Sequence, residues 1–206
     1  MLKIEYDKPL AALTTFHLRA NAEAWVEVAS LEDIRDALSV AKGRGWQTTI
    51  LGGGSNVVPM PLVPGLVIHP VFRGIHEAQS ESGSLVVVVG AAEALDDLVR
   101  YTVGKGLGGL ENLAAIPGSV GGAVVQNAGA YGVEMAERIA WVRVYDPDID
   151  DFRTLTPTDR DWSSDVCSSD LFWLSHEHLQ VQGRVSPHHY RGGLCASSGL
   201  AAGDGL

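Results

Sequence analysis

The sequence predicts an α+β fold built from two lobes. Segments typical of strands and of helices alternate along the first 160 residues, and glycine-rich segments at residues 52–56 and 109–132 interrupt them. Hydrophobic residues make up 46% of the chain and the mean hydropathy is +0.09, values ordinary for a globular protein. These patterns indicate mixed α and β elements in two lobes; they do not identify which two-lobed fold is formed.

The first lobe is expected over about residues 1–70. Ser30 and Asp33 form a near capping box, which is typical of a helix start, and the acidic side chains suit the helix dipole. The helix should then run with one apolar face toward stop signals at Gly43 and Gly45. Strands on both sides of this helix would make a small α/β lobe. The expected segments are strands at 25–28, 48–51 and 66–69, and the helix face Leu31, Ile34, Leu38 and Ala41.

The second lobe is expected over about residues 71–160. Residues 85–89 are a continuous apolar run of strand length, closed by Gly90, and residues 139–145 alternate loosely like a further strand. Between them, a helical face is formed by Leu95, Leu98, Val99 and Thr102. This lobe holds the longer glycine-rich segment.

The first glycine-rich segment, residues 52–56, directly follows an expected strand. Glycines allow positive φ angles and close approach to a ligand, and bare backbone N–H groups in such a loop bind anions. The loop lacks the lysine of a nucleoside-triphosphate loop, so Walker-type phosphoryl transfer is excluded. A turn without a ligand is the alternative, but a second segment of the same kind favours a pyrophosphate.

The second segment contains AIPGSVGG at 115–122 and QNAGAYG at 126–132. The small residues after Pro117 would let the backbone meet a ring or chain of a cofactor, and Tyr131 adds an amphipathic ring. A partly buried tyrosine without a ligand is the alternative.

The spacing G-x-G-x-x-G also occurs, at Gly104, Gly106 and Gly109. This match follows a helix rather than a strand, so it is read as a helix end and a Rossmann site is rejected. His17, His69 and His76 share no ligand spacing, so no metal site is predicted.

The two segments resemble the flavin-binding region of the UDP-N-acetylmuramate dehydrogenase family, also called UDP-N-acetylenolpyruvoylglucosamine reductase. That family carries a loop of the form LGxGSN and a segment GLExLxxIPGxVGxxxxQNxGAYGxE, which this chain follows as far as Glu134. The opening at residues 9–16 is similar too, with Thr14 where the family usually has Asn. The resemblance covers roughly residues 1–160.

This resemblance implies the two-lobed FAD-binding fold of the vanillyl-alcohol oxidase (PCMH) type, with non-covalent FAD and with NADPH as reductant. It also implies reduction of UDP-N-acetylglucosamine enolpyruvate to UDP-N-acetylmuramate for peptidoglycan, in the cytoplasm. The positions that it places against FAD are Gly52, Gly53, Gly54, Ser55, Asn56, Val57, Pro117, Gly118, Ser119, Gly121, Gly122, Asn127, Gly129, Ala130, Tyr131 and Gly132.

No catalytic residue is carried over from the family. Its proton-donating serine and the supporting glutamate belong to a downstream substrate domain that is expected to be missing here. Its arginine stands in a motif Y-R-[DE]-S after a stretch T-x-x-[DE], and residues 156–159 fit that stretch. Tyr190 and Arg191 lack the family's neighbours and spacing, so they are not that motif.

Residues 161–171 read DWSSDVCSSDL, which is the translation of a sequencing adapter. Residues 161–206 are therefore interpreted as an adapter-like and frame-shifted tail that adds no native packing. Both cysteines, Cys167 and Cys195, lie in it. A serine-rich and aspartate-rich surface loop is the alternative, but it does not explain an identity of eleven residues.

The formal net charge is −10, which argues against a nucleic-acid partner. The start of the chain lacks the apolar run of a signal peptide, and no stretch is long enough for a membrane span. A UDP-sugar is the expected partner, and the oligomeric state is left open. Two further hypotheses stay open: another FAD oxidoreductase of the same fold, and a non-catalytic nucleotide-binding fragment.

Overall fold

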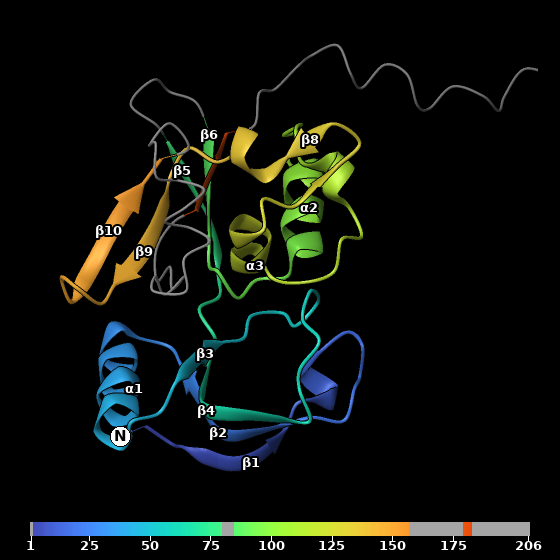
Figure 1. The fold of residues 1–206 in the computed structure, drawn as a ribbon. Helices are drawn as coiled ribbons and strands as arrows, with labels where there is room; N and C mark the ends of the chain where they lie inside the picture. The colour runs from blue at the N-terminus through green and yellow to red at the C-terminus, as the bar shows by residue number, and fades with distance from the viewer. Residues whose placement is uncertain (1, 80–84, 157–178, 183–206) are drawn as a thin grey trace, which may run out of the picture.

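The computed structural model describes residues 2–79, 85–156 and 179–182. We refer to residues 2–70 as the first lobe and to 71–156 with 179–182 as the second lobe; Figure 1 shows the first below the second. The first lobe contains β1 (Glu5–Pro9), η1 (Ala11–Leu13), β2 (Asn21–Val28), α1 (Leu31–Arg44), β3 (Thr48–Ile50) and β4 (Leu62–Pro70). The second contains β5 (Ile75–Gln79), β6 (Leu85–Val89), α2 (Leu95–Gly104), η2 (Glu111–Leu113), α3 (Val120–Val125), β7 (Gly129–Ala130), β8 (Val133–Glu134), η3 (Met135–Glu137), β9 (Val142–Asp146), β10 (Asp151–Leu155) and β11 (Leu179–Gln182).

The first lobe is a four-stranded sheet in the order β1-β2-β4-β3. β1 runs antiparallel to β2, whereas β4 runs parallel to both β2 and β3. The predicted helix and its three neighbouring strands are all present. The Ser30 hydroxyl accepts the Asp33 amide at 3.1 Å, and Gly45 ends α1 in the left-handed region at φ +65°.

Both faces of this sheet are buried. One face packs on α1 in a cluster that we call the first-lobe core, and the other packs against η1 and the chain after β3. The buried residues of the first-lobe core are Ala24, Val26, Val28, Ile34, Ala37, Ala41, Leu66, Ile68, Phe72 and Tyr145. Tyr145 comes from β9, so a strand of the second lobe completes this core.

The second lobe has an antiparallel sheet in the order β11-β6-β5 and a separate β9–β10 hairpin. α2 and α3 pack on the same core as β6, through residues such as Leu95, Leu98 and Val124. The expected strand at 85–89 and the expected helix face on α2 are confirmed. Gly104 is the last residue of α2 and Gly106 has φ +71°, so the G-x-G-x-x-G match is a helix end, as predicted.

Some elements differ from the sequence expectation. The strand expected from residue 139 starts only at Val142, because Ile139 still closes the turn of η3 by donating its amide to Met135. α3 was not predicted, since two of its six residues are glycines of poor helix propensity. It forms because Ser119 caps it and because it packs on Ala91.

The tail was expected to add no native packing, and this is wrong for four residues. The backbone of β11 pairs antiparallel with Val86–Val89 of β6. An apolar strand with an open edge accepts a further strand through its free backbone groups, whatever the source of the added segment. The adapter-like residues 161–171, Tyr190 and Arg191 lie outside the described residues.

The two lobes are joined at three places. The chain passes from β4 to β5, and Val71 donates its amide to Val28 at 3.0 Å. The β9–β10 hairpin extends toward α1 (Figure 1) and places Tyr145 and Phe152 against the first-lobe core. The two glycine-rich segments make the third contact. Among the described residues, none of the helices combines the length and apolar character of a membrane span.

Candidate functional site: two glycine-rich loops in contact

The first glycine-rich loop leaves the sheet after β3. Leu51 is buried and donates its amide to Ile68 at 3.0 Å, which holds the start of the loop on β4. Gly54 has φ +64°, and its carbonyl accepts the Thr15 amide at 3.0 Å. A Cβ on Gly54 would run into the carbonyl of Leu13. The loop therefore needs glycine here for both conformation and space.

The backbone of this loop fits a phosphate group. Within the described ranges, the amides of Gly54, Ser55 and Asn56 donate no hydrogen bond to the protein. Consecutive free N–H groups in a turn with positive φ form an anion-binding hollow. Val57, the last residue predicted in this loop, packs against the buried face around Trp25 instead.

The second glycine-rich segment reaches the first loop through Gly118 and Ser119. Gly118 has φ +119°, which turns the chain after Pro117 into α3. The Ser119 hydroxyl accepts the Gly122 amide at 3.2 Å as the helix cap, and it accepts the Gly53 amide at the same distance. Ser119 is only 7% exposed, so its hydroxyl oxygen links the two lobes from a buried side chain.

Glycines on both sides make this approach possible. A Cβ on Gly53 would lie 2.6 Å from the Ser119 nitrogen and 2.8 Å from the Gly118 Cα. A Cβ on Gly118 would meet the hydroxyl of Ser55, and one on Gly52 would lie 2.8 Å from the Ser119 hydroxyl. The loops thus touch each other directly, and the missing side chains are required by this contact.

Gly121 and Gly122 lie in α3 next to other parts of the protein, and a Cβ on Gly122 would lie 3.3 Å from the Ser119 hydroxyl. The Gly121 amide donates to the Ala91 carbonyl at 2.9 Å, and a Cβ there would lie 2.9 Å from the Ala91 Cβ. Gly121 is buried. Its missing side chain therefore serves the packing of α3 on the chain after β6.

The segment 126–132 forms a small hairpin of β7 and β8. Tyr131 and Gly132 make its turn, with φ +50° and +80°. Asn127 fixes the base of the hairpin: its Nδ2 donates to Glu134 at 2.8 Å and its Oδ1 accepts the Ala136 amide at 2.9 Å. Gly129 and Ala130 form β7.

Tyr131 is 90% exposed, so the alternative of a partly buried tyrosine is wrong. Its carbonyl accepts Asn112 Nδ2 at 3.2 Å, which connects this turn to η2. A non-glycine residue with positive φ and an uncovered ring is uncommon. The ring is available to a ligand.

Two of the three histidines considered above make ordinary contacts. His69 stacks on Trp25 with ring centroids 4.9 Å apart, and its Nδ1 contacts the Leu51 carbonyl at 2.7 Å. His17 Nδ1 contacts the Ala11 carbonyl at 2.9 Å. In the part of the chain that the structure describes, no three His, Cys, Asp or Glu side chains gather as a metal site would require.

Sequence reasoning missed two features beside the loops. The segment around Thr15 was noted only for its resemblance, yet it holds Gly54 in place. Glu93, 15% exposed in its side chain, accepts the Gly74 amide at 2.7 Å and so fixes the passage between the lobes. No pattern of spacing could have found Glu93, because its partner is a backbone amide. Of the stretch at 156–159, residues 157–159 lie outside the described residues.

The chain matches the family described as FAD binding domain over residues 22–148. It is 40% identical over 159 residues to UDP-N-acetylenolpyruvoylglucosamine reductase of Neisseria meningitidis serogroup C, a match that covers 77% of this chain and 46% of the relative. The reductase of Ralstonia nicotianae is 42% identical over 154 residues, covering 73% and 45%. The chain thus spans about half the length of these curated relatives.

Two solved structures are similar in fold. UDP-N-acetylenolpyruvylglucosamine reductase from Thermus caldophilus matches with a TM-score of 0.64 at 26% identity, covering 89% of this chain and 62% of that one. A solvent-stable cholesterol oxidase matches with a TM-score of 0.62 at 15% identity, covering 88% and 38%. The second likeness concerns the fold alone.

Proposed function

Because the chain belongs to the FAD binding domain family and has its two-lobed fold, we propose that it carries the FAD of a reductase acting on UDP-N-acetylenolpyruvoylglucosamine. FAD is the cofactor of this family. The observation that carries the proposed substrate is the 40% identity to the Neisseria meningitidis reductase over 159 residues. The product would be UDP-N-acetylmuramate, a peptidoglycan precursor made in the cytoplasm, and NADPH would be the reductant.

In this proposal, the first loop binds the pyrophosphate of FAD. The amides of Gly54, Ser55 and Asn56 would supply hydrogen bonds without any lysine, and the positive φ of Gly54 is typical of anion-binding turns. Ser119 holds the second segment against this loop, so the two lobes present one surface. Because the ligand would meet mainly backbone at this loop, the charge of its pyrophosphate would be balanced by fixed backbone dipoles. Non-covalent binding is what the family resemblance implies.

The turn at Tyr131 and the neighbouring Asn127 are proposed to face the flavin end of the cofactor. Tyr131 offers an uncovered aromatic ring and a carbonyl already fixed by Asn112. Held at these residues, FAD would supply hydride transfer between reduced nicotinamide and the enolpyruvyl double bond. The role of these residues is to position the cofactor and to exclude water around it.

We further propose that the chain as printed binds FAD but does not reduce the UDP-sugar. The reaction needs a proton donor next to the acceptor carbon, and a positioned acid contributes on the order of 10²–10⁴ in rate. No residue of this chain is assigned that role. The assay follows NADPH consumption by the FAD-loaded chain with and without the UDP-sugar, beside the full-length Neisseria enzyme. Substrate-dependent turnover comparable to that enzyme would refute this part.

Binding itself is tested first. The purified chain should quench flavin fluorescence on titration with FAD and keep the yellow cofactor through gel filtration. No binding at high micromolar FAD by the folded chain would refute the cofactor role. A different substrate within the same fold is the alternative, because cholesterol oxidase shares the architecture. Reduction of the bound FAD by NADPH, with no reduction by a sterol, would favour the reductase.

A further inference from the structure

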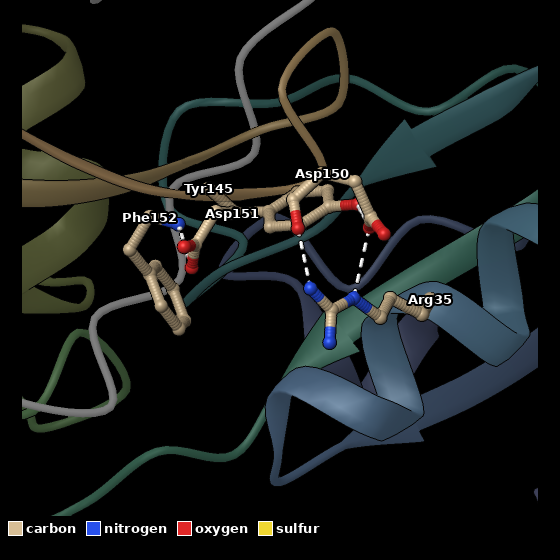
Figure 2. A network of polar contacts seen from close by, with 5 residues as sticks. All are labelled: Arg35, Tyr145, Asp150, Asp151 and Phe152. Carbon is tan, nitrogen blue, oxygen red and sulfur yellow. Dashed lines mark hydrogen bonds and ion pairs between the residues drawn. The ribbon is translucent and has the colours of Figure 1, made fainter.

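An ionic and polar contact joins the lobes at a place separate from the glycine loops. Arg35 on α1 donates from Nε to Asp150 Oδ1 at 2.8 Å and from Nη2 to the Asp150 carbonyl. Tyr145 donates its hydroxyl to the same carboxylate oxygen at 2.7 Å. Figure 2 shows the guanidinium of Arg35 reaching from the helix to the turn that carries Asp150. We call these three residues the lobe clasp.

The backbone of the hairpin is shaped for this contact. Asp150 lies in the turn between β9 and β10 with φ +51°, a left-handed conformation that aspartate tolerates better than most residues. The next residue, Asp151, accepts the Phe152 amide at 2.7 Å, and Tyr145 pairs with Phe152 across the hairpin. The turn therefore presents both a carboxylate and a carbonyl to one arginine.

One residue of the lobe clasp, Tyr145, is buried and therefore held in place by packing. Tyr145 is 2% exposed and belongs to the first-lobe core, and its ring meets Phe152 edge-on at 6.2 Å. Hydrogen bonds from Tyr145 and then from Arg35 lower the pKa of the Asp150 carboxyl, so it is charged over the ordinary pH range. Arg35 and Asp150 themselves are 42% and 63% exposed, which limits what their ion pair adds to stability.

The lobe clasp and the contact between the glycine-rich loops both restrain the orientation of one lobe relative to the other. The chain segment between the lobes fixes one point, but one lobe could still rotate against the other about that point. The Gly53–Ser119 hydrogen bond fixes a second and the β9–β10 hairpin on α1 a third. Three separate contacts define one relative orientation of the lobes, and with it the spacing between the two glycine-rich segments.

We propose that Arg35 and Asp150 are positioning residues for FAD, which hold the lobes at the orientation in which both glycine-rich segments engage the cofactor. This inference rests on the proposed FAD site. The clasp acts through Tyr145 and the hairpin on the spacing of the loops. Without the lobe clasp each loop keeps its own structure, but the relative orientation of the lobes is no longer fixed before FAD binds. Binding must then also order the lobes, and this cost lowers the affinity for FAD.

The chain offers a matched control within one lobe. Lys105 contacts Glu77 at 2.7 Å, and Tyr101 donates to the same carboxylate at 2.8 Å, so this trio repeats the chemistry of the clasp. Both partners are partly exposed, at 50% and 36%. All three residues lie in the second lobe: Glu77 in β5, Tyr101 in α2, and Lys105 directly after α2. Removing Lys105 costs a comparable ion pair without freeing the lobes.

The test uses the full 206-residue chain. Arg35→Ala should weaken FAD binding, measured by flavin fluorescence, about two- to fivefold, the range expected for losing one partly exposed charge pair. Arg35→Lys should recover part of the loss, because lysine reaches one oxygen but not both. The double variant Arg35→Ala/Asp150→Ala should bind FAD no more weakly than either single variant, because both changes remove the same contact. Lys105→Ala should bind FAD with an affinity within about twofold of the parent.

Hydrogen exchange gives a readout without cofactor. The amide hydrogen of Gly53 should exchange faster in Arg35→Ala than in the parent, whereas its exchange rate should stay unchanged in Lys105→Ala. This difference is expected even if both variants lose similar thermal stability. Parental FAD affinity and parental Gly53 exchange in Arg35→Ala would overturn the proposal while leaving the FAD site standing. Equal loss of affinity in Lys105→Ala would also overturn it. A folded parent that binds no FAD would refute the proposed function first.

Discussion

Replacing Gly53 by alanine tests whether the two glycine-rich loops must touch. The new Cβ would lie 2.6 Å from the Ser119 nitrogen and 2.8 Å from two backbone atoms of Gly118. Carbon atoms pack best at about 3.5–4.0 Å, so the loops would have to part by roughly an ångström. Because the atoms in the way belong to backbone, no side chain can turn aside to relieve the clash.

Overpacking of this kind costs about 1–3 kcal/mol. For a chain of this size each kcal/mol lowers the melting temperature by about 2–4 °C, so a cost of about 2 kcal/mol predicts a fall of about 4–8 °C. FAD binding should weaken as well, since the pyrophosphate would meet displaced amides. The measurements are thermal unfolding and a flavin fluorescence titration on the same preparation.

Gly43→Ala is the matched control. Gly43 lies in α1, and its Cβ would meet no atom within 4 Å. Alanine in a helix is more stable than glycine by about 0.5–1 kcal/mol, so this variant should melt slightly higher and bind FAD unchanged. If Gly53→Ala kept the parental melting temperature and FAD affinity, the direct loop contact described above would be refuted.

Three further predictions concern the lobes. Burial, and then the hydrogen bond to Asp150, raise the pKa of Tyr145 to about 12, so its stabilising effect is complete below about pH 10 and is lost as the pH rises through 12. Tyr145→Phe should flatten that fall in unfolding free energy, and an equally steep fall in this variant would contradict the role of Tyr145. Ser30→Ala should destabilise by about 1 kcal/mol through loss of the α1 cap, with Ser30→Asp as the conservative control, and an unchanged denaturation midpoint would contradict the capping role. Ending the chain at residue 156 should lower the melting temperature, because β6 loses β11; an unchanged temperature would show that the tail adds nothing after all.

Local signals were sufficient for some elements. α1 was predictable because its cap, apolar face and glycine end all act within the helix. β6 was predictable as an unbroken apolar run. α3 was not, because its glycines argue against a helix and its support comes from Ala91 and from Ser119, which also contacts the other lobe.

The candidate site was predictable as a set of positions but not as an arrangement. The sequence indicates that positions 52–54, 118, 121 and 122 need glycine, yet it does not say what fills the space beside them. The structure shows that Gly53 faces Ser119 and that Gly121 faces Ala91, so part of the glycine content serves packing. The clasp could not be predicted, since Arg35 and Asp150 are far apart in the chain and follow no motif.

The place of Tyr145 inside the first-lobe core has a consequence for synthesis. When residues 2–70 have left the ribosome, all residues of the sheet and of α1 are available, but the position that Tyr145 fills in the first-lobe core is still empty. Contacts of such sequence separation form late and slowly, since a long loop must close first. We therefore expect the first-lobe core to stay incomplete during synthesis, with part of its apolar surface exposed to solvent, until the β9–β10 hairpin has left the ribosome. In crowded conditions the hairpin of a second copy could fill that position, and the product would be a domain-swapped dimer.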